Sequence, residues 1–171
     1  MTVFLIGYRG SGKSTVGKRL ANELWYKFLD TDAEVVKRAG KSIRQIFEQD
    51  GENAFRSLEG GVVREACALA DHVIALGGGA VLLPENRQAI KSSGAKVIYL
   101  RCDPATLHKR IQGDGGSVDN RPPLTAAGGG IEEITRLCAE REPLYRELAG
   151  KELEVSNLTP EEASRYVIRL L

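Results

Sequence analysis

The segment Val3-Phe4-Leu5-Ile6-Gly7-Tyr8-Arg9-Gly10-Ser11-Gly12-Lys13-Ser14-Thr15 carries the strongest structural signal in this chain. A short apolar run comes first, a glycine-rich turn follows, and Lys-Ser-Thr opens a segment with helical periodicity. Gly7, Gly12, Lys13 and Ser14 match the pattern G-x-x-x-x-G-K-[ST], and the strand–loop–helix setting that this pattern needs surrounds it. The segment therefore predicts a phosphate-binding loop between a first strand and a first helix.

Each part of this loop answers a need of a bound triphosphate. Glycine has no Cβ, so the turn adopts dihedral angles closed to other residues and its N–H groups can approach the phosphates closely. The positive end of the following helix dipole adds to that attraction. Lys13 is expected to bridge the β- and γ-phosphates, and the Ser14 hydroxyl to bind Mg²⁺. The residues predicted to hold the nucleotide are Gly10, Ser11, Gly12, Lys13, Ser14 and Thr15.

The bulk composition favours one domain over residues 1–171. A chain of 171 residues with 42% hydrophobic residues can bury a proper core. The formal net charge of +1 gives no overall field that would favour nucleic acid or anionic lipid as a partner. Cys67, Cys102 and Cys138 are odd in number and widely spaced, which predicts reduced thiols. Because there is neither a signal-peptide pattern nor an apolar run of about 20 residues, we expect a cytoplasmic protein outside the membrane.

Strand and helix signals alternate along the chain, which is typical of an α/β fold with a mainly parallel sheet and right-handed crossovers. Five apolar runs bounded by breakers predict the strands, and these are Val3–Ile6, Phe28–Leu29, Val73–Leu76, Val97–Leu100 and Leu153–Val155. In an open parallel sheet the ligand crevice lies beyond the carboxyl ends of the strands. We therefore expect the functional residues just after these five runs.

A helical insertion is predicted at about residues 32–70, because the long segment between the second and third strands carries no strand signal. Its expected helices are Asp32–Ala39, Ile43–Glu48 with Ser42 as its cap, and Glu52–Leu69. Such an insertion would overhang the sheet edge beside the phosphate loop. We therefore expect it to bind the acceptor substrate.

A loop at about residues 112–129 is rich in glycine and proline and has no periodicity. Its single basic residue is Arg121, which favours a lid over a plain linker, because a kinase must keep water away from the γ-phosphate. The linker alternative stays open at this point. Beyond the loop, Ile131–Leu148 predicts a helix that Pro143 breaks or kinks, and Thr159-Pro160 predicts the start of a last helix.

Two of the predicted strands are followed directly by residues that could bind a ligand, aspartates in one case and glycines in the other. Asp30 and Asp32 follow the second strand, where one carboxylate could lie near Mg²⁺ and another could orient or deprotonate an acceptor hydroxyl. An ordinary helix cap is the alternative. Gly77, Gly78 and Gly79 follow the third strand, where bare backbone would let a small ligand pack against N–H groups, although a tight turn would also explain them.

Arg56 and Arg141 lie in segments that otherwise have the pattern of amphipathic helices. Considered singly, each arginine is explained as a surface residue on the solvent-exposed face of its helix. Considered together, two guanidinium groups suit the carboxylate of a small anionic substrate.

Taken in order, the motifs of this chain resemble those of the shikimate kinase family over nearly its whole length. Besides the phosphate loop they are Leu29-Asp30-Thr31-Asp32, Ile46-Phe47 with Gly51-Glu52 and Phe55-Arg56, Leu76-Gly77-Gly78-Gly79-Ala80, Arg121-Pro122 and Arg141-Glu142-Pro143-Leu144-Tyr145. The resemblance implies a P-loop NTPase fold like that of nucleoside monophosphate kinases, a three-layer sandwich in which helices flank a five-stranded parallel sheet, with a helical shikimate-binding insertion and a lid. It also implies ATP- and Mg²⁺-dependent phosphorylation of shikimate to shikimate 3-phosphate, a step towards chorismate and the aromatic amino acids. We expect a monomer.

The same resemblance implies roles on the acceptor side of the site. Asp32 would bind the shikimate hydroxyls and would act as, or assist, the base at the 3-hydroxyl. Arg56 and Arg141 would clamp the ring carboxylate. The backbone of residues 77–79, Gly78 above all, would hold a hydroxyl.

On the nucleotide side, the resemblance implies that Lys13 and the lid residue Arg121 neutralise charge on the transferring phosphoryl group. Ser14 would bind Mg²⁺ directly, Asp30 would hold it through water, and Arg110 would pack near adenine. These assignments agree with the chemistry, because phosphoryl transfer leaves the protein mainly positioning and charge neutralisation to supply.

The chain departs from the family's pattern at two places. The loop Ser156-Asn157-Leu158 lacks the basic residue that some members place there, so a nucleotide contact would have to come from backbone or from Ser156 and Asn157. Pro123 replaces the leucine often found after Arg-Pro in the lid.

Two other functions share part of the pattern. A gluconate-type or nucleoside monophosphate kinase would have the same loop and sheet, but it would not need Asp32, Arg56, Gly78 and Arg141 together. A nucleotide-binding switch module would need a surface for its partner, and the sequence shows no tail, extra domain or exposed apolar run for one.

Overall fold

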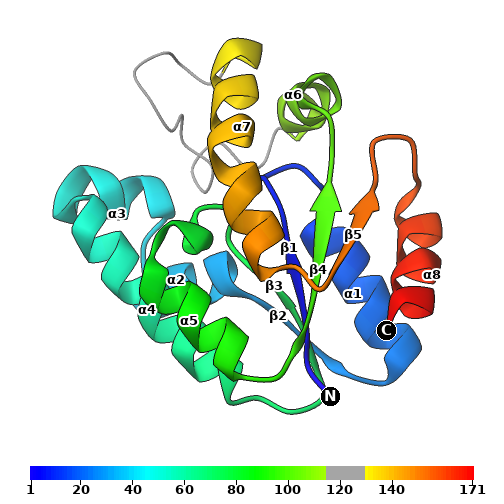
Figure 1. Ribbon diagram of the computed structural model, residues 1–171. Coiled ribbons are helices and arrows are strands. Elements are labelled where there is room, and N and C mark those ends of the chain that lie inside the picture. The colour runs from blue at the N-terminus through cyan, green and yellow to red at the C-terminus, as the bar shows by residue number, and fades with distance from the viewer. Residues whose placement is uncertain (115–129) are drawn as a thin grey trace.

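A parallel sheet of five strands forms the centre of the computed structural model, which describes residues 1–114 and 130–171 (Figure 1). The strands are β1 (Val3–Ile6), β2 (Lys27–Asp30), β3 (His72–Ala75), β4 (Lys96–Arg101) and β5 (Lys151–Glu154). Their order in the sheet is β2-β3-β1-β4-β5, and every neighbouring pair is parallel. The predicted α/β fold with a five-stranded parallel sheet is confirmed.

Helices connect these strands and cover both faces of the sheet. They are α1 (Lys13–Leu24), α2 (Thr31–Ala39), α3 (Ile43–Asp50), α4 (Glu52–Cys67), the short 3₁₀ helix η1 (Ala80–Leu82), α5 (Pro84–Ser92), α6 (Pro104–Gly113), α7 (Ile131–Leu148) and α8 (Pro160–Leu170). Parallel strands need such crossovers because the chain must return to the same end of the sheet before the next strand begins. Figure 1 shows α1 and α8 on one side of the sheet and α4 and α5 on the other.

The central strand β1 divides its side chains between two cores. Val3 and Leu5 pack in a cluster that includes residues of α1, α6 and α8, while Phe4 and Ile6 pack in a second cluster with residues of α4, α5 and α7. This division follows from the alternation of side chains along a strand. Burial of both faces makes β1 fully inaccessible to solvent, so it is a rigid base for the loop that follows it.

The insertion between β2 and β3 consists of α2, α3 and α4, which share a small core of their own. Local signals set its boundaries. The Asp30 carboxylate caps α2, Gly40 ends it with a left-handed conformation, and Ser42 with Gln45 forms a capping box at the start of α3. The predicted helices are therefore present, although α3 continues to Asp50 and α4 ends at Cys67.

The predicted strands were placed within a few residues of the observed ones. The largest error is at β5, which begins at Lys151 rather than at Leu153. Lys151 and Glu152 pair with β4 at the edge of the sheet, and both are exposed. Edge strands tolerate such polar residues, so a search for apolar runs does not detect this part of the strand.

Of the two effects predicted for Pro143, a break or a kink, the break is wrong, because α7 runs without interruption from Ile131 to Leu148. A proline in a helix deprives the carbonyl four residues earlier, here that of Ala139, of its N–H donor. Pro143 and Ala139 both lie on the exposed side of α7, where water can satisfy that carbonyl.

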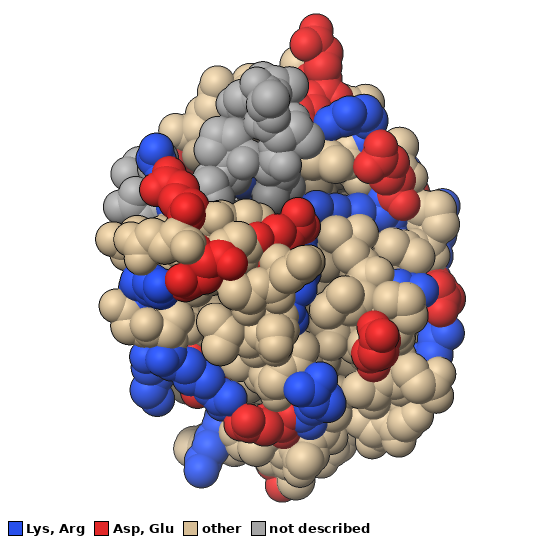
Figure 2. Space-filling view, turned by 90° about the vertical axis from the view of Figure 1, so that its left-hand side faces the viewer, with Lys and Arg blue, Asp and Glu red and all other residues tan. Residues whose placement is uncertain are grey.

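The distribution of surface charge and the state of the cysteines agree with what the composition predicted. On the face that Figure 2 shows, basic and acidic side chains lie intermingled in small groups rather than in one field of a single sign. All three cysteines are free thiols, as predicted. In the described part of the chain, no helix combines the length and the apolar character that crossing a bilayer would require.

Candidate active site

The phosphate loop leaves β1 at Gly7 and enters α1 at Lys13. Gly7 has a φ of 147°, and a Cβ there would lie 2.5 Å from the carbonyl oxygen of Leu100. Gly12 has a φ of 94° and is the N-cap of α1. No other residue fits the Gly7 position without a clash, and the loop therefore keeps its backbone N–H groups and the amino end of α1 directed at one pocket.

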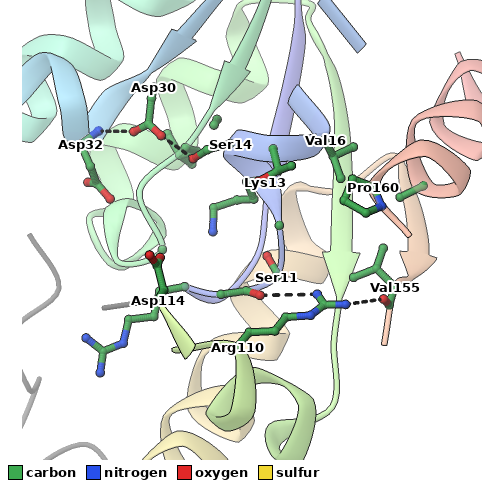
Figure 3. A pocket seen from close by; sticks show the side chains of 18 of the residues that line it. Ser11, Lys13, Ser14, Val16, Asp30, Asp32, Arg110, Asp114, Val155 and Pro160 are labelled. Atoms are coloured by element: carbon green, nitrogen blue, oxygen red, sulfur yellow. Dashed lines mark hydrogen bonds between the residues drawn. The ribbon is translucent and has the colours of Figure 1, made fainter. Parts of the chain in front are cut away.

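Lys13 lies across this loop. Its Nζ donates hydrogen bonds to the carbonyl oxygens of Gly7 at 2.8 Å and Tyr8 at 2.9 Å, and the side chain is buried apart from its contact with the pocket. Figure 3 shows the Lys13 amine between the carboxylates of Asp30 and Asp32 on one side and Arg110 on the other. A positive charge therefore occupies the centre of the pocket.

The carboxylate of Asp30 is fixed by two elements at once. One oxygen accepts hydrogen bonds from the backbone N–H groups of Asp32 at 3.0 Å and Ala33 at 3.2 Å, and the other accepts from the Ser14 hydroxyl at 2.5 Å (Figure 3). The end of β2 is thus joined to the first turn of α1. Ser14, Asp30 and Asp32 all line the pocket and present oxygen atoms, the ligand type that Mg²⁺ prefers.

The pocket has a volume of about 560 Å³, enough for a small-molecule ligand. Its far wall is formed by Arg110 of α6 and by residues after β5, namely Val155, Leu158, Thr159 and Pro160. Arg110 donates to the carbonyl oxygens of Gly10 at 3.5 Å and Val155 at 3.1 Å, so it connects this wall to the phosphate loop.

Sequence reasoning missed most of this far wall. It left open whether the backbone or Ser156 and Asn157 would supply a nucleotide contact there, and the Ser156 hydroxyl accepts a hydrogen bond from the backbone N–H of Asp103 at 2.9 Å. The lining residues are apolar or are helix-capping residues, which no catalytic pattern singles out. Their position after the carboxyl end of β5 was the signal that could have identified them.

The glycines after β3 are packed against the predicted acceptor-side residues. A Cβ on Gly77 would overlap the Asp32 carboxylate, and one on Gly79 would lie 2.7 Å from a nitrogen of Arg56. Gly78 abuts the phosphate loop, where a Cβ would lie 3.2 Å from the backbone nitrogen of Arg9. The requirement for glycine here is therefore one of space, since the side chains from the insertion occupy the volume that a Cβ would need.

Arg56 is held by a buried carboxylate that sequence reasoning did not identify. Its guanidinium donates to Glu59 at 2.8 Å, with the two side chains 13% and 1% exposed. Glu59 stands one helical turn after Arg56 on α4, and that spacing was the available signal. Burial raises the pKa of Glu59 to about 7, although the Arg56 charge and hydrogen bond oppose the rise.

This shift predicts a pH-dependent loss of stability. The ordinary carboxyl value is 4.5, so between pH 4.5 and 7 the unfolded chain releases its proton while the folded protein retains it. Relative to Glu59→Gln, the free energy of unfolding of the wild type should therefore fall by about 2 to 3 kcal/mol between pH 4.5 and pH 8. Urea unfolding of both proteins at a series of pH values measures this difference.

Glu52 offers a matched control, because it pairs with the same Arg56 at 3.6 Å but is 63% exposed. Its replacement by glutamine should change stability only slightly, since an exposed ion pair is screened by solvent. A constant difference between wild type and Glu59→Gln across the pH range would contradict the assignment of a buried, perturbed carboxyl.

Arg141 of α7 is 6% exposed, yet it forms no ion pair with a carboxylate of the described residues. Its guanidinium lies 5.6 Å from the centre of the Tyr8 ring. Tyr145, one turn further along α7, donates its hydroxyl to the carbonyl oxygen of Gly78 at 2.7 Å and so connects this helix to the glycine turn. Burial of a charge costs free energy that a bound anion would offset, which makes Arg141 a strong candidate for binding one.

The structure brings most of the predicted residues to one end of the sheet. The phosphate loop, Asp30, Asp32, Gly78 and Arg110 line the pocket, and contacts from Asp32 to Gly77 and from Arg56 to Gly79 connect it with the insertion. Arg121 lies outside the described residues.

Comparison with known proteins identifies this arrangement. A model of the family described as "Shikimate kinase" matches residues 9–171. The shikimate kinase of Thermobifida fusca is 42% identical over 167 residues, covering 98% of this chain and 92% of the relative, and that of Caldanaerobacter subterraneus is 41% identical, covering 98% and 94%.

Solved structures give the same result. Shikimate kinase from Acinetobacter baumannii in complex with shikimate has a TM-score of 0.89 and 33% identity, covering 99% of this chain and 91% of that one. Shikimate kinase from Aquifex aeolicus has a TM-score of 0.81, also at 33% identity, covering 99% and 95%. With the phosphate loop, the helical insertion and the glycine turn arranged as described, this chain belongs to the shikimate kinase family.

Proposed function

We propose that this protein transfers the γ-phosphate of ATP to the 3-hydroxyl of shikimate. The observation that carries the proposal is the position of Asp32, whose carboxylate lines the same pocket as Lys13 while packing against the glycine turn. A carboxylate beside a phosphate-binding lysine suits an acceptor hydroxyl that must be oriented and relieved of its proton. The A. baumannii relative, solved with shikimate, supports the choice of acceptor.

On the nucleotide side, the loop residues 10–15 are proposed to hold the phosphates and Arg110 the adenosine part. The donor set at the end of β2 fits Mg²⁺, because Ser14 and Asp30 present hard oxygen atoms that two helices hold in place. Ser14 would bind the ion directly and Asp30 through water. When bound, Mg²⁺ supplies charge neutralisation on the phosphate oxygens.

On the acceptor side, Arg56 and Arg141 are proposed to bind the carboxylate of shikimate and the glycine turn to bind a hydroxyl. Asp32 would then accept the proton of the reacting hydroxyl as its oxygen attacks the γ-phosphorus. Lys13 would stabilise the charge that spreads over the transferring group, and Arg121 is proposed to assist it. Catalysis in this scheme is mainly positioning and electrostatics, as phosphoryl transfer requires.

The direct test is to incubate the purified protein with Mg-ATP and shikimate and to follow ADP release together with the phosphorus NMR signal of a phosphate monoester. Gluconate and a nucleoside monophosphate serve as competing acceptors, because kinases for these compounds share the loop and the sheet. Rapid turnover of either one, with none of shikimate, would overturn the proposal. We further propose that the protein works as a monomer in the cytoplasm, where ATP is available and thiols stay reduced.

Gly77→Ala is expected to reduce kcat for shikimate at least about tenfold, because its methyl group would displace the Asp32 carboxylate within the pocket that Lys13 also lines. The KM for ATP should change little. Gly61→Ala on α4 is the control, since among the described residues a Cβ there would meet only the end of the Arg64 side chain, at 4.0 Å. If Gly77→Ala folds and keeps its full kcat, the carboxylate position does not matter for turnover.

A further inference from the structure

The guanidinium of Arg141 contacts two tyrosines that come from different parts of the chain. The guanidinium carbon lies 5.6 Å from the centre of the Tyr8 ring, which belongs to the phosphate loop. On its own helix, Arg141 is hydrogen-bonded to the Tyr145 hydroxyl. Burial raises the pKa of that hydroxyl, while the charge and the hydrogen bond of Arg141 oppose the rise. That hydroxyl also donates to the carbonyl oxygen of Gly78.

Tyr8 makes this contact with its ring and not with its hydroxyl. The side chain is 3% exposed, and its buried hydroxyl has no hydrogen-bond partner among the described residues. A guanidinium gains most from the face of an aromatic ring where solvent is excluded. Arg141 is 6% exposed and forms no salt bridge within the described parts of the chain, although its charge also lowers the pKa of the buried Glu59 carboxyl.

The backbone of Tyr8 is fixed by the catalytic lysine. Lys13 donates to the Tyr8 carbonyl oxygen at 2.9 Å, so one residue of the loop contacts both the cation for the phosphate and the cation for the acceptor. Position 8 is one of the unspecified positions of the phosphate-loop pattern, and nucleotide binding alone does not require an aromatic ring there.

We infer that Tyr8 is a positioning residue for acceptor recognition, because its ring fixes the Arg141 guanidinium in a set relation to the phosphate loop. The inference rests on the proposed role of Arg141 in binding the carboxylate of shikimate. A guanidinium binds a carboxylate best when its plane is already oriented, since two parallel hydrogen bonds need a single geometry. Without the ring, Arg141 keeps its hydrogen bond to Tyr145 but loses the surface that fixes the plane of its guanidinium, and the acceptor must restore that orientation on binding.

Tyr8→Leu should raise the KM for shikimate about tenfold, equivalent to about 1.4 kcal/mol, while kcat and the KM for ATP stay within about twofold. Tyr8→Phe should behave as the wild type, because it keeps the ring and loses a hydroxyl that makes no hydrogen bond. Steady-state kinetics with each substrate varied in turn measures all three constants. A purely structural role for Tyr8 would change the KM for ATP as well, because the residue belongs to the nucleotide loop.

Tyr166 and Arg169 of α8 provide a matched control, since that pair has the same separation of 5.6 Å but Tyr166 is 45% exposed. Tyr166→Leu should leave every kinetic constant unchanged. If Tyr8→Leu does not fold, Tyr8→Met tests the same point with a flexible side chain that also lacks a ring. An unchanged KM for shikimate in a folded Tyr8→Leu or Tyr8→Met protein overturns the inference.

An Arg141→Lys background separates this inference from the proposed function. A lysine lacks the planar group that the ring orients, so adding Tyr8→Leu to Arg141→Lys should raise the KM for shikimate much less than tenfold. If Arg141→Lys alone leaves shikimate binding unchanged, the proposed carboxylate clamp fails. If Arg141→Lys weakens binding and Tyr8→Leu adds its full effect to it, the clamp stands and the positioning role of Tyr8 fails.

Discussion

Asp32→Asn is expected to lower kcat for shikimate phosphorylation about 1,000-fold while ATP affinity stays within about twofold. Asparagine has the size of aspartate, so it can keep the place against Gly77 that the carboxylate occupies. It cannot accept the proton of the acceptor hydroxyl, and it removes a negative charge that would orient that hydroxyl. The loss should therefore appear in turnover, because hydrogen bonds to two loop carbonyl groups and to Asp30 place Lys13 and Ser14, the residues proposed to hold the nucleotide.

Turnover is measured by coupling ADP release to a reporter reaction, and ATP affinity by calorimetry with a non-hydrolysable analogue. Glu34→Gln is the control on the same helix, since Glu34 pairs with Arg38 away from the pocket. An equal loss of ATP affinity and turnover in Asp32→Asn would mean that Asp32 serves the nucleotide and that the acceptor binds elsewhere.

The sequence predicted those parts of the molecule that depend on neighbouring residues. The phosphate loop is one contiguous segment whose glycines have a steric reason, and the helix caps at Ser42 and Thr159 are local hydrogen-bond patterns. The rule that ligands bind at the carboxyl ends of parallel strands then placed Asp30 and Asp32 beside that loop, and both line the pocket.

Residues whose surroundings depend on tertiary packing were harder to predict. Considered singly, Arg56 and Arg141 had the pattern of exposed helix residues, yet both are largely buried. Burial of a charge on a helix depends on which other elements cover it, and local periodicity does not contain that information. Glu59 and Tyr8 were missed for the same reason, because their importance comes from the arginines that they contact.

Arg141→Ala is expected to lower kcat/KM for shikimate by about 1,000-fold, mainly through the KM. Hydrogen bonds to a charged group contribute about 1.5 to 3 kcal/mol each, and a carboxylate clamped by two parallel bonds loses both. Arg141 forms no salt bridge within the described residues, and the carboxylate that its charge influences, Glu59, would keep its hydrogen-bonded partner Arg56. The folded state should therefore tolerate the change better than it would the loss of Arg56, which would leave the buried Glu59 uncompensated.

Arg136→Ala is the matched control, because Arg136 lies five residues earlier on the same helix with its side chain in solvent. It should leave kcat/KM for shikimate within about twofold of the wild type, since exposed charges contribute little. Thermal unfolding of both variants, with and without an ATP analogue, shows whether the nucleotide site survives. If Arg141→Ala binds shikimate as the wild type does, the buried charge of α7 has another purpose. If it loses ATP binding together with shikimate binding, Arg141 supports the phosphate loop itself through Tyr8, and the acceptor must be recognised by Arg56 alone.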